Sequence, residues 1–154
     1  MNKALLAALA ALVALAAIVA GCGGGDDSET TETLTKTEFI KQGDAICEKA
    51  NEESEAEAEE FAEENDFTLE KASKEQIEEA VGEVLVPNLN GQVEDLRALG
   101  APEGDEDQVE EILVSLEGAA DEIEEDPGLV YEEETLAKPS KLAEAYGFEV
   151  CGEE

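Results

Sequence analysis

The apolar residues of this chain form one unbroken run near the N-terminus and, after residue 33, shorter groups that recur at helical spacing. The run covers residues 4–20 and contains only Ala, Leu, Ile and Val. The later groups are spaced by three and four residues, the interval at which side chains share one face of a helix. This pattern predicts an all-α domain over residues 34–154.

A first long helix is predicted to begin after Thr35. Thr35 and Glu38 have the spacing of a capping box, in which each side chain accepts a hydrogen bond from the other residue's backbone amide. Leu34 and Phe39 flank this pair as a hydrophobic staple. The helix then presents a narrow stripe of apolar and small residues: Phe39, Ile40, Gly43, Ile46, Cys47, Ala50, Ser54, Ala58 and Phe61.

A second helix is predicted to begin after Ser73, which is followed by Gln76 at capping-box spacing. Pro87 falls inside its apolar pattern, and a proline inside a helix removes one backbone hydrogen bond and clashes with the preceding turn. We therefore expect a kink or a break near Val86. The apolar positions of this helix are Ile77, Ala80, Val81, Val84, Leu85, Leu89, Val93, Leu96 and Leu99.

Two further helical segments complete the pattern. Asp105 or Gly104 can cap a third helix, whose apolar face ends before the break at Asp126-Pro127-Gly128. A fourth helical region is expected to be interrupted near Pro139 and capped again at Ser140. Four amphipathic helices with short connections predict an antiparallel bundle of about four helices.

The apolar run at the N-terminus has the features of an export signal. Lys3 precedes it, and the run is slightly shorter than the roughly 20 residues of a membrane-spanning helix. Its end, Val19-Ala20-Gly21-Cys22, resembles the lipobox of bacterial lipoproteins, in which an aliphatic residue and two small residues precede an invariant Cys. The resemblance implies that residues 1–21 are a cleaved signal peptide, that Cys22 carries lipid, and that the protein is held at the extracytoplasmic face of a cell membrane. A retained transmembrane anchor and an ordinary secretory signal with a free Cys are the alternatives.

The segment that follows, residues 22–33, begins with Cys22 and three glycines and continues with acidic and hydroxyl residues alone. Such a composition cannot form a core and is typical of a flexible linker. As a random coil it would span about 20 Å, which is enough to lift the domain above lipid headgroups.

Charge and missing residue types restrict the function. The chain has 42 acidic and 9 basic residues, a formal charge of −33. Nucleic acid is not an expected partner, because duplex binding depends on Lys and Arg that neutralise phosphates. The chain also has no His and no Trp, which removes His-based acid–base catalysis and the usual zinc ligand sets. We expect no catalytic residues, no cofactor and no metal ligands.

Two cysteines remain once Cys22 is lipidated: Cys47, on the apolar face of the first helix, and Cys151, near the C-terminus. In a chain exported to an oxidising compartment, a disulfide between them is the economical inference. A reactive thiol pair is the alternative. The two cysteines do not form a Cys-X-X-Cys motif, and the chain has no His. Few basic residues lie near them in the sequence to stabilise a thiolate.

The domain carries a second resemblance, to a group of small uncharacterised actinobacterial lipoproteins. It implies the same pairing of Cys47 with Cys151 but no activity. The segments similar to that group are Leu34–Ile40, Asp44–Cys47, Val86-Pro87, Leu96–Leu99 and Ala145–Gly152.

Two functional hypotheses follow. The favoured one is a noncatalytic envelope lipoprotein, anchored through Cys22, that binds a protein, a peptide or a cation. The alternative is a domain that uses carboxylates to bind a small ligand or a divalent cation, or to act as an enzyme. Gly104-Asp105-Glu106-Asp107 and Glu63-Glu64-Asn65-Asp66 could offer oxygens to calcium, although neither matches an EF-hand loop, and a solvated acidic surface is the simpler interpretation. A deep apolar pocket with convergent acidic side chains would favour the alternative.

Overall fold

The computed structural model describes residues 33–152. The segment 1–21, the lipobox and Cys22, and all of the predicted linker except Thr33, lie outside the described residues. All regular secondary structure in the described part of the chain is helical, and this part contains no strand. None of its helices is both long enough and apolar enough to cross a membrane.

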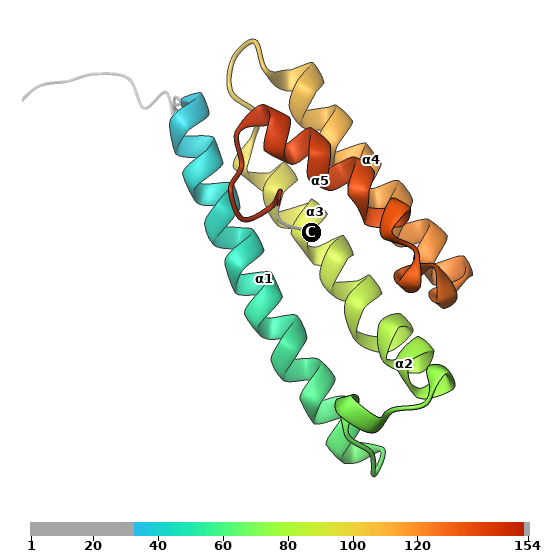
Figure 1. Ribbon diagram of the computed structural model, residues 1–154. Coiled ribbons are helices and arrows are strands. Elements are labelled where there is room, and N and C mark those ends of the chain that lie inside the picture. The colour runs from blue at the N-terminus through green and yellow to red at the C-terminus, as the bar shows by residue number, and fades with distance from the viewer. Residues whose placement is uncertain (1–32, 153–154) are drawn as a thin grey trace, which may run out of the picture. The chain divides into compact units, whose positions relative to one another are not determined.

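Five α-helices make up the fold: α1 (Lys36–Glu64), α2 (Lys74–Ala80), α3 (Val86–Leu99), α4 (Glu106–Glu125) and α5 (Glu133–Tyr146). Short 3-10 turns at Leu69–Lys71 and Pro127–Tyr131 lie in two of the connections. In Figure 1, α1 runs down, α2 and α3 run up as one rod, α4 runs down and α5 runs up. This arrangement confirms the predicted all-α, antiparallel bundle of about four helices.

Both predicted capping boxes are present. The Thr35 hydroxyl accepts a hydrogen bond from the Glu38 amide at 3.3 Å, and the Glu38 carboxylate accepts one from the Thr35 amide at 3.0 Å. Ser73 and Gln76 make the same reciprocal pair at 3.3 and 2.9 Å. The hydrogen bonds from Thr35 lower the pKa of Glu38 below its usual value, because they favour the charged carboxylate.

The rod formed by α2 and α3 is interrupted by a π-helical turn at Val81–Leu85. There the Val86 amide donates to the Val81 carbonyl, five residues earlier instead of four. Pro87 then falls in the first turn of α3, where a missing backbone N–H is tolerated. The interruption expected near Val86 is therefore this π turn, and the helix continues beyond it.

The interruption predicted near Pro139 is wrong. α5 runs without a break from Glu133 to Tyr146, with Pro139 inside it and Ser140 in its interior rather than at a cap. Pro139 and Ser140 are both buried. Packing of α5 against α4 holds the helix together in spite of the hydrogen bond that the proline removes.

Asp105, one of the two residues predicted to cap α4, occupies the N-cap position. Its side chain, however, accepts no hydrogen bond from the first turn of the helix. The carboxylate instead accepts a hydrogen bond from the Tyr146 hydroxyl at 2.9 Å and lies 3.6 Å from the Lys36 ammonium. Burial, reinforced by the bond to Asp105, raises the pKa of the Tyr146 phenol well above its usual value. This cluster ties α1, α4 and α5 together at one end of the bundle.

The core has two parts. Around the cluster just described, three aromatic rings pack with centroids 5.5–6.1 Å apart, namely Phe39, Tyr146 and Phe148. The predicted staple residue Leu34 packs against this part. The second part lies toward the other end of α3 and α4 and includes Val81, Leu89 and Ile123.

Candidate functional site

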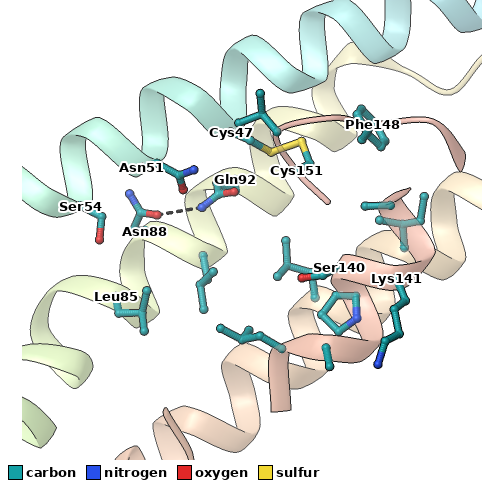
Figure 2. A pocket seen from close by; sticks show the side chains of 18 of the residues that line it. Cys47, Asn51, Ser54, Leu85, Asn88, Gln92, Ser140, Lys141, Phe148 and Cys151 are labelled. Atoms are coloured by element: carbon teal, nitrogen blue, oxygen red, sulfur yellow. Dashed lines mark hydrogen bonds between the residues drawn. A yellow bond between two sulfur atoms is a disulfide. The ribbon is translucent and has the colours of Figure 1, made fainter. Parts of the chain in front are cut away.

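A groove opens along one side of the bundle because its first and last helices do not pack closely. α3 packs against both α1 and α4, and α5 packs against α4, which leaves little direct contact between α1 and α5. The space between them, floored by α3, is a cavity of about 720 Å³. Figure 2 shows this cavity from close by.

Apolar side chains from α3, α4, α5, the helical turns that precede α3 and α5, and the C-terminal tail form most of its wall. Several of them are only partly buried, so that the groove presents accessible apolar surface. These wall residues are Leu85, Leu89, Leu96, Ile112, Leu116, Val130, Leu136, Ala137, Pro139, Ala143, Phe148 and Val150.

Two amides on α3 interrupt this apolar wall and are linked by hydrogen bonds. The Asn88 side chain donates from Nδ2 to the backbone carbonyl of Ala50 on α1 at 2.8 Å. The Gln92 side chain, only 8% exposed, donates from Nε2 to Asn88 Oδ1 at 2.9 Å, as Figure 2 shows. Gln92 Oε1 is the remaining acceptor of this pair, and it is not among the fully buried side-chain atoms of residues 33–152 that lack a partner. These two hydrogen bonds form a relay from Gln92 through Asn88 to α1, and the Gln92 oxygen is its remaining acceptor.

A third buried polar group comes from the opposite wall. Ser140 is 9% exposed, and it lines the cavity. Figure 2 shows its hydroxyl on the side of α5 that faces the groove. Asn51 and Ser54 of α1 also line the cavity. The inner polar groups are thus amides and hydroxyls.

The charged residues that line the cavity are all exposed. Glu132, Glu133 and Glu134 lie at the start of α5, and Lys141 lies further along the same helix. The acidic first turn of α5 is also favourable for the helix itself, because carboxylates stabilise a helix N-terminus. Carboxylates therefore stand at the mouth of the groove and do not converge inside it.

The C-terminal tail closes one end of the groove and is held in two ways. The predicted disulfide between Cys47 and Cys151 is present, with Cα atoms 5.3 Å apart. The Asp44 carboxylate accepts hydrogen bonds from the backbone amides of Glu149, Val150 and Cys151 at 2.8–3.2 Å. Because Phe148, Val150 and Cys151 line the cavity, these bonds also fix its shape.

The two segments considered for calcium do not form a site. Asp105 is engaged with Tyr146 and Lys36, and Glu106 accepts a hydrogen bond from the Gly104 amide at 2.8 Å. In the other segment, the Asn65 side chain donates to the Phe61 carbonyl at 2.8 Å. Within residues 33–152 no three acidic or cysteine side chains gather so that they could hold a metal ion.

Sequence reasoning missed the polar groups of the groove. Asn88 and Gln92 lie four residues apart within the apolar pattern of α3, and polar residues in an apolar stripe are a signal that could have marked them. The position of Ser140 directly after Pro139 predicts a helix cap, whereas the structure places Ser140 in the interior of α5. Its true setting depends on α5 being continuous.

Comparisons with known proteins add no family to this geometry. A scan against protein-family models, a search of curated proteins and a search of solved structures found no match. The apolar wall of the groove, with a few inward-facing amides and hydroxyls, is suited to reversible binding of a small ligand.

Proposed function

We propose that the protein is a lipoprotein anchored through Cys22 at the extracytoplasmic face of a cell membrane, and that its helical domain is a noncatalytic module that binds a small, largely apolar ligand. The lipobox resemblance of Val19-Ala20-Gly21-Cys22 supports the anchor. The disulfide between Cys47 and Cys151 supports export, because such bonds persist in oxidising compartments.

The observation that carries the binding proposal is the groove between α1 and α5. Its volume of about 720 Å³ lies within the range of about 300–1,000 Å³ that is typical of small-molecule sites. Apolar walls supply affinity through burial, and a few placed polar groups supply orientation. Gln92 and Ser140 are such groups, since both residues are mostly buried and both line the cavity.

The chemistry of the groove supports binding and not catalysis. Its inner polar groups are amides and hydroxyls, which neither take up nor release a proton near neutral pH. The carboxylates of Glu132, Glu133 and Glu134 are exposed, and they lack the burial that adapts acids for catalysis. Among the described residues, the carboxylates that line the groove do not converge inside it, so the groove gives the carboxylate-based alternative no support.

The binding proposal is tested with an uncharged, environment-sensitive dye such as Nile red. The protein used is the chain from residue 22 with Cys22→Ser, so that no lipid competes for the dye. Ala137 lines the groove, and Ala137→Trp would fill it. Ala98, an exposed residue of α3 outside the groove, gives the matched control Ala98→Trp.

The expected result is saturable binding of one dye molecule by the parent chain and by Ala98→Trp, with affinity weakened about tenfold or more by Ala137→Trp. Absence of saturable binding by the parent chain would overturn the proposed function. Equal binding by all three proteins would place the dye outside the groove, with the same consequence.

The anchor is tested separately in cells. The native chain should enter the membrane fraction and incorporate labelled fatty acid, whereas Cys22→Ser should do neither, because the thioether to lipid forms at that sulfur. Fatty-acid incorporation that persists in Cys22→Ser would contradict the proposed anchor.

A further inference from the structure

We propose that the ligand of this groove is an organic cation: an amphiphile with an apolar body and a protonated amine that carries N–H donors. This inference rests on the proposed binding function and specifies the class of ligand. It is drawn from the direction of the hydrogen-bond relay on α3 and from the charges at the groove mouth.

The relay has only one possible direction. The backbone carbonyl of Ala50 can only accept, so Asn88 must turn its NH₂ group toward it. Asn88 Oδ1 then faces Gln92 and must receive a donor, which fixes Gln92 Nε2 against it. Gln92 Oε1 is left as the free end. An acceptor in this position selects a ligand that donates a hydrogen bond.

Displacement of water from this acceptor makes the selection strong. Gln92 as a residue is 8% exposed, but its carbonyl oxygen is not among the fully buried side-chain atoms of residues 33–152 that lack a partner, so it keeps contact with the water of the groove. An acceptor that loses its water when a ligand binds costs free energy unless the ligand supplies a donor. The Ser140 hydroxyl on the opposite wall can accept a second N–H. A ligand amine, which carries several N–H groups, can satisfy such acceptors.

The charges at the mouth select a cation. Glu132, Glu133 and Glu134 contribute three negative charges and Lys141 one positive charge, so the rim is acidic. The chain as a whole carries a formal charge of −33, which attracts cations toward the domain at long range. An anionic amphiphile would be repelled both by the acidic chain as a whole and by the carboxylates of the rim. A neutral amphiphile would gain no electrostatic attraction from the rim.

A series of ligands with one decyl chain separates these contributions. Decylamine, protonated at pH 7, has both charge and N–H donors; decyltrimethylammonium has charge alone; decanol is neutral; decanoate is anionic. Each is titrated below its aggregation concentration into the Cys22→Ser chain from residue 22, and its affinity is measured from displacement of the neutral dye. The expected order is decylamine tightest and decanoate weakest, with decylamine about tenfold or more tighter than decanol.

Two sets of substitutions that change the net charge equally show whether the carboxylates at the groove mouth, and not the overall charge, raise the affinity for cations. Glu132→Gln, Glu133→Gln and Glu134→Gln together alter the groove mouth. Exposed residues at the end of α4 that do not line the groove supply the matched triple, Glu122→Gln, Glu124→Gln and Glu125→Gln. The first set should weaken both decyl cations about tenfold and leave decanol unchanged, and the second set should have little effect.

The donor effect is tested with Gln92→Met, which keeps the length of the side chain and removes the acceptor. Decylamine should lose its advantage over decyltrimethylammonium in this variant, while the affinity for decyltrimethylammonium changes little. The melting temperature shows whether the variant is folded, and the Glu→Gln sets test the cation independently of it.

The outcomes distinguish this inference from the function on which it rests. Equal affinity for decylamine and decanol would overturn the cationic ligand and leave the groove as a binding site. Equal weakening by both triple sets would mean that cations gather on the acidic surface in general, which also overturns the inference. Binding of none of the four ligands, nor of the dye, would remove the proposed function itself.

Discussion

Gly43 shows how a single residue seats the C-terminal tail. A Cβ atom at this position would overlap the Phe148 ring and come 3.1 Å from Cδ2 of Leu96. The absence of a side chain thus lets the tail lie directly on α1, next to the disulfide. The sequence predicted Gly43 as part of the small-residue stripe of α1. It could not predict the Phe148 ring as its partner, because that contact forms only when the tail folds back.

Replacing Gly43 with Ala is expected to destabilise the protein. The added methyl group must displace a buried ring, and overpacking of this kind costs about 1–3 kcal/mol. Gly91, inside α3 with open space around its Cβ direction, is the control. Gly91→Ala should instead stabilise the protein by about 0.5–1 kcal/mol, because alanine is the better helix former. Urea unfolding measures both changes, and loss of stability in both variants would contradict this account of Gly43.

The residues of the groove mark the limit of prediction at this scale. Capping residues and cysteines act through near neighbours or through a covalent bond, so Thr35, Glu38 and the pair of Cys47 and Cys151 could be predicted. The free oxygen of Gln92 depends on a backbone carbonyl of another helix. No local pattern contains that information.

At the scale of elements, the start of α1 has a defined pH dependence. Hydrogen bonds from Thr35 lower the pKa of Glu38 in the folded protein. A carboxyl group with a lowered folded pKa stabilises the protein at pH values above its ordinary pKa, 4.5 here, and loses that contribution as the pH falls through the folded value.

Glu38→Ala should therefore lower the urea midpoint at pH 7, and the difference from the parent chain should shrink below pH 4.5. Glu52, an exposed residue of α1 outside the cap, gives the control Glu52→Ala, which should not lower the midpoint at pH 7. A difference between parent and Glu38→Ala that is constant from pH 7 to pH 3 would show that the carboxylate charge does not contribute to the cap.

Prolines show why the elements were only partly predictable. Pro87 and Pro139 both fall inside apolar patterns, and both were expected to disturb a helix. Pro87 coincides with a π turn, after which α3 begins, whereas Pro139 lies inside a continuous α5. The difference lies in tertiary packing: Pro139 is buried and Pro87 is exposed. Propensity alone cannot weigh that packing.

At the scale of the whole molecule, the disulfide joins the first helix to the tail across 104 residues. The chain-entropy argument gives a stabilisation of about 4–5 kcal/mol for such a loop, as an upper value. Because Phe148, Val150 and Cys151 line the groove, the same bond also fixes the groove's end.

Cys47→Ser combined with Cys151→Ser should lower the free energy of unfolding by about 2–4 kcal/mol, and should weaken dye binding even where the chain is fully folded. Treating the parent chain with a reductant should reproduce both effects, whereas the double variant should not respond to reductant. Unchanged dye affinity in the folded double variant would mean that the tail does not shape the groove.

The architecture followed from the sequence more readily than the site. Helical spacing and short connections predict the number of helices and their alternating directions. Spacing and connection lengths do not predict which pair of helices stays apart. The separation of α1 from α5 results from the way α3 packs against α1 and α4, and α4 against α5. The groove is a consequence of that packing.

The most direct test of the central claim, that the groove is the binding site, is a two-dimensional ¹H–¹⁵N NMR titration of the Cys22→Ser chain with decylamine. We expect saturable shifts at a ratio of one to one, concentrated in the segments that line the groove: residues 47–54 of α1, 85–96 of the α2–α3 rod, 112–116 of α4, 130–143 of α5 and the turn before it, and 148–151 of the tail. Shifts that grow without saturation and spread along the acidic face of α1 would contradict this claim.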